Sequence, residues 1–226
     1  MQIFSPGKRL LKVSEYIGGA NAIIDVGSDH GRLPAWLLLN GKIQKAYASD
    51  ISSASVAKIN TLAQRFGLEN SLFGIQCDGL SAFSGDEADT VTICGMGGET
   101  IVHILQNAPW ILDGNHRIIL QCMSSFDVIN DFLHRCCLKL IDEAVVKDTG
   151  RLYDILMLKG QHGHKNPEIT VPSRHIISDE FAGEYINRLV RIEEAQLNGM
   201  LCSPVQNAEA IRRAKLRLEH YSNLLK

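Results

Sequence analysis

Apolar residues in the first two thirds of the chain fall into short runs separated by stretches with helical periodicity. The run Ala22–Val26 has four apolar residues in five positions, three of them β-branched, which is typical of a buried strand. Similar runs predict further strands, and the stretches between them predict helices bounded by serine, glycine or proline. The pattern predicts five strands, at 22–26, 45–50, 71–76, 89–94 and 116–121, and five helices, at 5–17, 33–39, 52–66, 99–107 and 126–136.

A different pattern begins at residue 138. Leu138–Val146 and Arg151–Leu158 alternate without a helix between them, and Asp148-Thr149-Gly150 separates them as a turn signal. Strands linked by helices indicate a parallel sheet, whereas two strands joined by a tight turn indicate an antiparallel hairpin. We therefore expect an α/β fold with a Rossmann-like sheet and a terminal β-hairpin.

The composition changes again after Gly160. Residues 161–167 are typical of a linker, and two helical runs follow at 176–198 and 205–225, broken by Gly199 and by Ser203-Pro204. Apolar residues in both runs recur at steps of three and four, which predicts an antiparallel α-helical hairpin, or coiled coil. The residues expected in this seam are Phe181, Tyr185, Leu189 and Ile192 from the first run, and Ile211, Ala214, Leu218, Tyr221 and Leu225 from the second. We expect a sheet domain over 1–160 and a helical domain over 161–226.

Composition narrows the possible functions. The 226 residues carry a net charge of −2, so a nucleic-acid partner would have to use local basic patches. The six cysteines show no CxxC spacing and the eight histidines no HExxH motif, and so no metal site is expected. No apolar run approaches the ~18 residues of a membrane span. The N-terminus also lacks a signal-peptide core. We expect a soluble cytoplasmic protein, without a membrane partner, that is a monomer or a weak dimer.

The turn after the first strand is the first candidate site. Asp25-Val26-Gly27-Ser28-Asp29-His30-Gly31 joins a strand to a helix, as in nucleotide-binding α/β folds. The dinucleotide fingerprint would place a glycine at position 29, where a carboxylate would repel a pyrophosphate. S-adenosylmethionine instead carries an ammonium and a sulfonium near its reactive end, and Asp25 and Asp29 would attract both. The turn favours that cofactor, although Asp29 could also simply cap the next helix.

Three further strand ends should lie beside this turn. In a parallel sheet ligands bind beyond the carboxyl ends of the strands. Asp50, followed by Ile51, is placed to accept hydrogen bonds from ribose hydroxyls. Asp78, within Cys77-Asp78-Gly79, could accept one from an adenine amino group, or could be an ordinary turn aspartate. Cys94 and Gly95 complete the expected cofactor site. Met96, Gly97 and Gly98 would let a flat substrate approach the backbone, or would only allow tight packing.

Two basic clusters are candidate contacts for RNA phosphates. Lys8 and Arg9 lie at the start of the first helix, and Arg212 and Arg213 lie on the polar side of the last one. Both clusters could equally be ordinary solvated helix faces. We include all four side chains among the candidate substrate-binding residues.

Four phrases occur together in order: Asp25-Val26-Gly27-Ser28-Asp29-His30-Gly31, Gly95-Met96-Gly97-Gly98, Ile119-Leu120-Gln121 and Tyr153-Asp154-Ile155-Leu156. Over residues 8–158 the chain resembles the bacterial tRNA N1-methyladenosine methyltransferases that modify adenine 22 in the D-arm. The resemblance implies a class I methyltransferase fold, S-adenosylmethionine as cofactor, tRNA as partner and a coiled coil that helps to hold it. Cys122 departs from the proline common in that family, and Cys94 from a frequent alanine.

The chemistry needs little catalytic machinery. N1 of an unpaired adenine has a free lone pair, and the methylated product can stay cationic, so proximity to the methyl group can supply much of the rate. Asp29 and His30 are our candidate catalytic residues near that point. Methylation of another RNA base or a small molecule, or a non-catalytic adenosyl-binding tRNA module, remain as alternatives. Asp29 disfavours a dehydrogenase.

Overall fold

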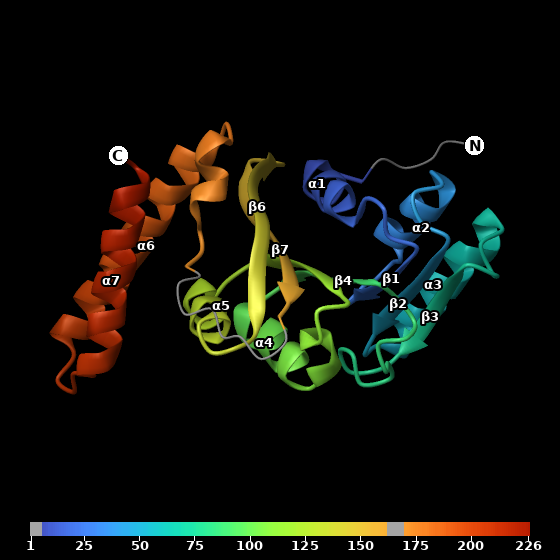
Figure 1. Cartoon of the computed structure of the whole chain (residues 1–226), viewed down its shortest axis with the longest axis horizontal. Helices are drawn as coiled ribbons and strands as arrows, with labels where there is room; N and C mark the ends of the chain where they lie inside the picture. Colours follow the sequence, from blue (N-terminus) through green and yellow to red (C-terminus); the bar gives the residue numbers. More distant parts are fainter. Residues whose placement is uncertain (1–5, 162–169) are drawn as a thin grey trace.

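The computed structural model describes residues 6–161 and 170–226, and its centre is one seven-stranded sheet (Figure 1). The strand order is β3-β2-β1-β4-β5-β7-β6. Strands β1 to β5 pair in parallel, and β7 lies antiparallel between β5 and β6. This topology confirms the predicted Rossmann-like sheet with a terminal hairpin. The strands are β1 (Ala22–Val26), β2 (Lys45–Asp50), β3 (Leu72–Gln76), β4 (Thr90–Met96), β5 (Arg117–Cys122), β6 (Leu138–Asp148) and β7 (Arg151–Gly160).

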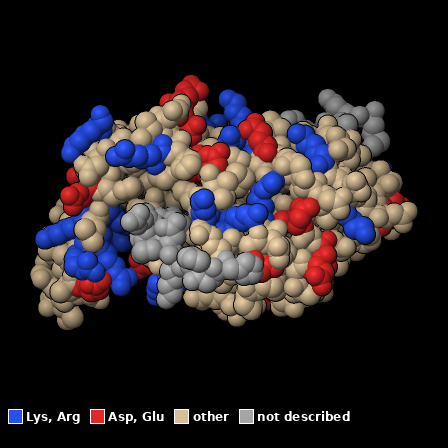
Figure 2. All heavy atoms as spheres, viewed as in Figure 1, with Lys and Arg blue, Asp and Glu red and all other residues tan. Residues whose placement is uncertain are grey.

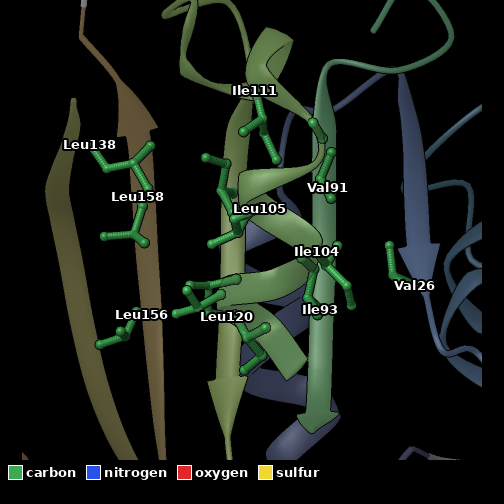
Figure 3. Close-up of a cluster of buried hydrophobic side chains, with 14 of the residues drawn as sticks. Val26, Val91, Ile93, Ile104, Leu105, Ile111, Leu120, Leu138, Leu156 and Leu158 are labelled. Carbon is green, nitrogen blue, oxygen red and sulfur yellow. The ribbon is translucent and has the colours of Figure 1, made fainter. Parts of the chain in front are cut away.

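Helices cover both faces of the sheet, because the central strands are apolar on both sides. Val13, Leu33 and Ile59 bring α1, α2 and α3 into one buried cluster with β1 and β2. Helices α4 and α5 cover the opposite face, where Ile104 and Leu105 of α4 lie over β4 and β5 (Figure 3). The helices are α1 (Lys8–Ile17), α2 (Arg32–Leu39), α3 (Ser53–Phe66), α4 (Gly98–Gln106), the short 3-10 helix η1 (Pro109–Leu112) and α5 (Phe126–Leu133).

Strand β4 differs from its predicted end. It continues past Cys94 through Gly95 to Met96, so the first half of the Gly95–Gly98 run belongs to the strand. The pairing with β5 shifts register between Cys94 and Met96, and Gly95 has a φ of +81°. A glycine at such a bulge lets the strand bend while it stays paired. From the sequence alone, the glycine-rich run is interpreted as a turn after the strand.

The hairpin turn supports the first helix. Thr149 and Gly150 both have positive φ, which gives the two-residue turn that suits the twist of paired strands. Asp148 beside this turn accepts a hydrogen bond from the Arg9 backbone N–H at 3.1 Å. The carboxylate therefore provides a hydrogen-bond acceptor for a backbone N–H in the first turn of α1, which begins after Gly7. Ser5, the predicted capping residue, lies outside the described residues.

Both C-terminal helices begin later than predicted, and the first of them also ends later. Residues 174–178 form a 3-10 helix, η2 (Arg174–Ser178), and α6 (Ala182–Cys202) runs straight through Gly199. One glycine costs a helix only about 1 kcal/mol, so it does not by itself end α6. The helix α7 (Ala208–Leu224) packs on α6 with Ala214, Tyr221 and Leu224 buried, whereas Leu225 and Ile192 are exposed. Of the predicted linker, residues 162–167 lie outside the described residues.

The helical hairpin packs on β6 and β7 through a buried junction. Val145, Ile176 and Tyr185 share an apolar cluster there. The Tyr185 hydroxyl donates to Asp154 at 3.1 Å, and the Ser173 N–H donates to Glu143 at 2.6 Å. Burial raises the pKa of both carboxyl groups. The division at residue 160 stays a prediction, because the two parts share this buried surface. None of the helices within residues 6–161 and 170–226 could span a membrane.

Candidate functional site

The turn between β1 and α2 is fastened to the end of β2. The N–H groups of Gly27 and Ser28 both donate to the Ser49 carbonyl, and the Asp29 N–H donates to Asp50 Oδ2 at 3.1 Å. Gly27, Asp29 and Gly31 all have positive φ. Such a backbone is ordinary for glycine and tolerated by aspartate. The turn therefore brings the predicted cofactor residues of β1 and β2 together at the carboxyl edge of the sheet.

Asp50 lies half-buried at the end of β2. Its Oδ1 accepts a hydrogen bond from the Ser52 N–H at 2.9 Å, and its Oδ2 accepts the bond from Asp29. A carboxylate has about four lone-pair sites, so two remain for a ligand. The backbone donors also hold the carboxylate in place before any ligand arrives. This geometry fits an acceptor for vicinal hydroxyls.

Asp25 is the buried member of the turn. Its Oδ1 accepts a hydrogen bond from Thr92 Oγ1 at 2.6 Å, and its Oδ2 accepts one from the Ser28 hydroxyl. Burial raises the pKa of the Asp25 carboxyl, while the two hydroxyl donors and the charge of Arg9 oppose that rise. Asp25 therefore ties β1, β4 and the turn together, and it does not present an open binding face. Thr92 was not among the predicted residues, since a threonine inside a strand has no signal of its own.

Asp29 and His30 lie on the outer side of the turn. The Asp29 side chain is 63% exposed and lies 3.3 Å from His30 Nε2 and 3.9 Å from Lys58 Nζ. Helix α2 has Gly31 at its N-cap with no side-chain hydrogen bond, so Asp29 does not cap it. That simpler interpretation of Asp29 is wrong. The catalytic role of Asp29 and His30 stays a prediction.

The ends of β2 and β3 form the far wall of the site. Gln76 Nε2 donates to the Ile51 carbonyl at 3.3 Å, which holds the two strand ends together. The Ile51 side chain is 69% exposed, and Asp78 is exposed with no hydrogen-bond partner for its carboxylate among the described residues. Both are available to a ligand. Cys77 and Gly79 instead make contacts within the protein. The Cys77 thiol donates to the Gly79 carbonyl, and Gly79 packs on Ile104 of α4.

The segment Cys94–Gly98 divides into an open part and a packed part. At Gly95 an added Cβ would meet only Arg9 Nη1, at 3.7 Å, whereas at Gly98 it would lie 2.2 Å from the Ser125 carbonyl oxygen. Gly98 is thus needed for packing on the β5–α5 loop, and Gly97 lies against Ser124 of the same loop. The Met96 side chain lies across Gly27, whose added Cβ would be 2.0 Å from the methionine methyl carbon. Burial raises the pKa of the Cys94 thiol to about 12, so it stays protonated at neutral pH.

Arg9 enters the site from α1, while the neighbouring Lys8 is exposed. The Arg9 guanidinium donates to Gln121 Oε1 at the end of β5 and lies 5.4 Å from the centre of the Tyr153 ring. Gln121 is fully buried and also donates to the Cys122 carbonyl at 2.8 Å. Gln121 and Tyr153 were not among the predicted site residues, and their presence in two of the phrases that carry the resemblance is the signal that could have found them. These three side chains form the wall of the site opposite Asp50.

The predicted tRNA contacts on α7 belong to the C-terminal helices and are paired with acidic side chains. Arg212 and Arg213 both bind Glu209, and Arg213 also binds Asp131 of α5. Basic and acidic side chains accordingly lie side by side over the C-terminal helices (Figure 2). Contact of Arg212 and Arg213 with tRNA stays a prediction. The described residues contain no group of His, Cys, Asp and Glu that could hold a metal ion.

Comparisons with known proteins agree with this geometry. A family model described as "Methyltransferase domain" matches residues 7–156. The curated tRNA (adenine(22)-N(1))-methyltransferase of Bacillus subtilis (strain 168) is 36% identical over 150 residues, which cover 66% of this chain. The match spans 63% of the length of that relative.

Solved structures resemble the whole chain. The crystal structure of the B. subtilis M1A22 tRNA methyltransferase TrmK has a TM-score of 0.80 at 26% identity and covers 100% of both chains. The structure of M. capricolum TrmK in complex with S-adenosyl-homocysteine has a TM-score of 0.75 at 21% identity, again over 100% of both chains. At that lower identity the second likeness concerns the fold alone. The sheet and the helical hairpin are thus found together in both proteins.

Proposed function

The chain belongs to the methyltransferase domain family, and we propose that it transfers a methyl group from S-adenosylmethionine to N1 of adenine 22 in tRNA. The observation that carries the proposal is the 36% identity, over 150 residues, to a B. subtilis enzyme named for that reaction. The likeness to the B. subtilis structure extends over the C-terminal helices as well. A cytoplasmic location and a monomeric or weakly dimeric state belong to the same proposal.

The residues at the carboxyl edge fit the proposed cofactor. Asp50 has two free lone-pair sites for the ribose hydroxyls. Ile51 is open to pack on the adenine ring, and Asp78 is free to accept from the adenine amino group. Asp25 and Asp29 add negative charge toward the ammonium and the sulfonium. When bound there, S-adenosylmethionine supplies an electrophilic methyl group.

The chain itself would mainly orient the substrate. Gly95 lets a flat base approach the backbone, because little lies near its missing Cβ. Arg9, Gln121 and Tyr153 would limit where that base can lie. N1 of adenine needs no base to remove a proton, so holding it in line with the methyl group can supply much of the rate. Asp29 and His30 would be the polar groups at the rim, with Lys8 and Arg9 reaching toward the RNA.

The test is methyl transfer to unmodified tRNA transcripts. The chain is incubated with S-adenosylmethionine carrying a labelled methyl group, and the tRNA is digested to nucleosides. We expect labelled 1-methyladenosine from the natural transcript and none from a transcript with guanosine at position 22. A label in another nucleoside would support a different RNA methyltransferase. Binding of tRNA and cofactor without transfer would support the non-catalytic module.

A further inference from the structure

A continuous groove runs between α6 and the sheet edge that is formed by the end of β5 and the start of β7. Two hollows of about 450 Å³ each meet there. Met123, Phe126, Arg188, Leu189 and Ile192 line both of them. We call this hollow surface the α6 groove.

The groove begins beside the methyl-transfer site. The Met123 N–H, at the end of β5, donates to the Met96 carbonyl at 2.8 Å. Tyr153 lines the groove and also faces Arg9 in the site. A strand of RNA whose target base lies against Gly95 would therefore carry its next nucleotide toward this groove.

The walls of the groove suit a nucleotide. Met123 and Ile192 are each 41% exposed, which is unusual for large apolar side chains and gives a face for a base. Phe126 adds an aromatic ring. Proteins hold unpaired RNA bases on such surfaces and bind the adjoining phosphates with arginine.

The arginines of the groove point to a negatively charged ligand. Arg151 and Arg188 are exposed, and among the described residues neither side chain makes a hydrogen bond or an ion pair. Two acids of the groove are already paired, Glu184 with Lys147 and Glu193 with Arg217. Glu99 and Asp127 also line it, and they could accept hydrogen bonds from base amino groups. The two free guanidinium groups thus offer positive charge at the rim.

We propose that the α6 groove binds an unpaired nucleotide next to the methylated adenine, with Arg151 and Arg188 on its phosphates. This rests on the proposed function, since it assumes a tRNA substrate. It adds a specific RNA contact surface on α6 and the hairpin turn, distinct from the α7 face with Arg212 and Arg213.

The experiment compares Arg151→Ala with Arg188→Ala, alone and combined, in the full chain. The matched control is Arg191→Ala, which removes an exposed arginine of α6 that does not line the groove and has no side-chain partner within residues 6–161 and 170–226. We expect the double variant to raise KM for tRNA about tenfold and to lower the slope of log K against log salt by about 0.7 per lost contact. Calorimetry should show unchanged S-adenosylmethionine binding, and melting curves should match the parent.

The outcomes separate the two proposals. If the parent methylates tRNA and the double variant binds it as tightly as Arg191→Ala, the groove proposal is overturned and the proposed function stands. If the parent transfers no methyl group to tRNA, both are overturned. Equal losses of tRNA and cofactor binding in the double variant would also overturn the groove, because they would indicate a disturbed fold.

Discussion

The carboxyl edge of the parallel strands and the junction with the C-terminal helices both contain acidic side chains, held in opposite ways. At the edge, Asp50 and Asp78 keep oxygens open to solvent, and Asp50 is held by backbone donors. At the junction, Glu143 and Asp154 are buried, with their pKa values raised. An acid that is fixed yet accessible can bind a ligand, whereas a buried acid with internal partners holds two parts of a chain together. Variants at the two places should therefore affect different measurements.

The largest effect is expected at the junction, from Tyr185→Ala. Tyr185 is 2% exposed and donates to Asp154. Truncating a buried aromatic residue costs about 3–5 kcal/mol of folding stability. Urea denaturation should show this loss, while the protein that remains folded binds S-adenosylmethionine as the parent does. Tyr185→Phe keeps the ring and should lose about 1–3 kcal/mol, the cost of leaving a buried acceptor unpaired. Weaker cofactor binding by folded Tyr185→Phe would contradict the view that the junction acts on stability and the carboxyl edge on cofactor binding.

Asp50→Ala should have the converse effect at the edge. We expect S-adenosylmethionine to bind about 1–3 kcal/mol more weakly, the scale of hydrogen bonds to a charged group, with little change in stability. Calorimetry measures this directly. The matched control is Asp89→Ala, since Asp89 also accepts a backbone N–H, from Asn21 at 2.7 Å, but at the amino edge of the sheet. If Asp89→Ala loses as much cofactor affinity as Asp50→Ala, the loss in Asp50→Ala reflects a disturbed fold and not a lost contact with the cofactor.

The junction should also respond to pH. Burial raises the pKa of Asp154, and the nearby Glu143 raises it further. The folded state then holds protons that the unfolded state has released, so stability is complete below the unfolded pKa near 4 and is lost as pH rises through the folded pKa. Urea midpoints should therefore fall with rising pH over that interval. Asp154→Asn should flatten the dependence, and an unchanged slope in this variant would assign the proton to another group.

The sequence predicts the edge far better than the junction. Strands such as Ala22–Val26 are strong local signals, and in a parallel sheet their carboxyl ends must meet, which is why Asp25, Gly27 and Asp50 come together as expected. The sequence does not predict which glycines serve packing, because the Ser125 carbonyl that lies against Gly98, and the open space beside Gly95, are set by other elements of the fold.

The junction depends on contacts between residues far apart in the chain. Asp154 and Tyr185 are 31 positions apart, and the sequence around either residue does not predict the hydrogen bond between them. The start of α6 was mispredicted at residue 176 for a similar reason, because Ile176 is buried in the junction as part of a 3-10 helix. The sequence places Arg212 and Arg213 on a polar helix face, but the ion pairs with Glu209 and with Asp131, the latter 82 positions away, depend on the fold.

The smallest effect is expected from Arg212→Ala combined with Arg213→Ala. These side chains lie at the surface, as those of the carboxyl edge do, but they form ion pairs with Glu209 and Asp131. A phosphate would have to compete with these carboxylates, so each arginine offers RNA less than the free Arg188 does. We expect tRNA affinity, and its slope against salt, to change less than in Arg188→Ala, measured by the same titrations. A larger loss of slope in the α7 variant than in Arg188→Ala would mean that the paired arginines exchange their acids for phosphates and that α7 is the main RNA contact.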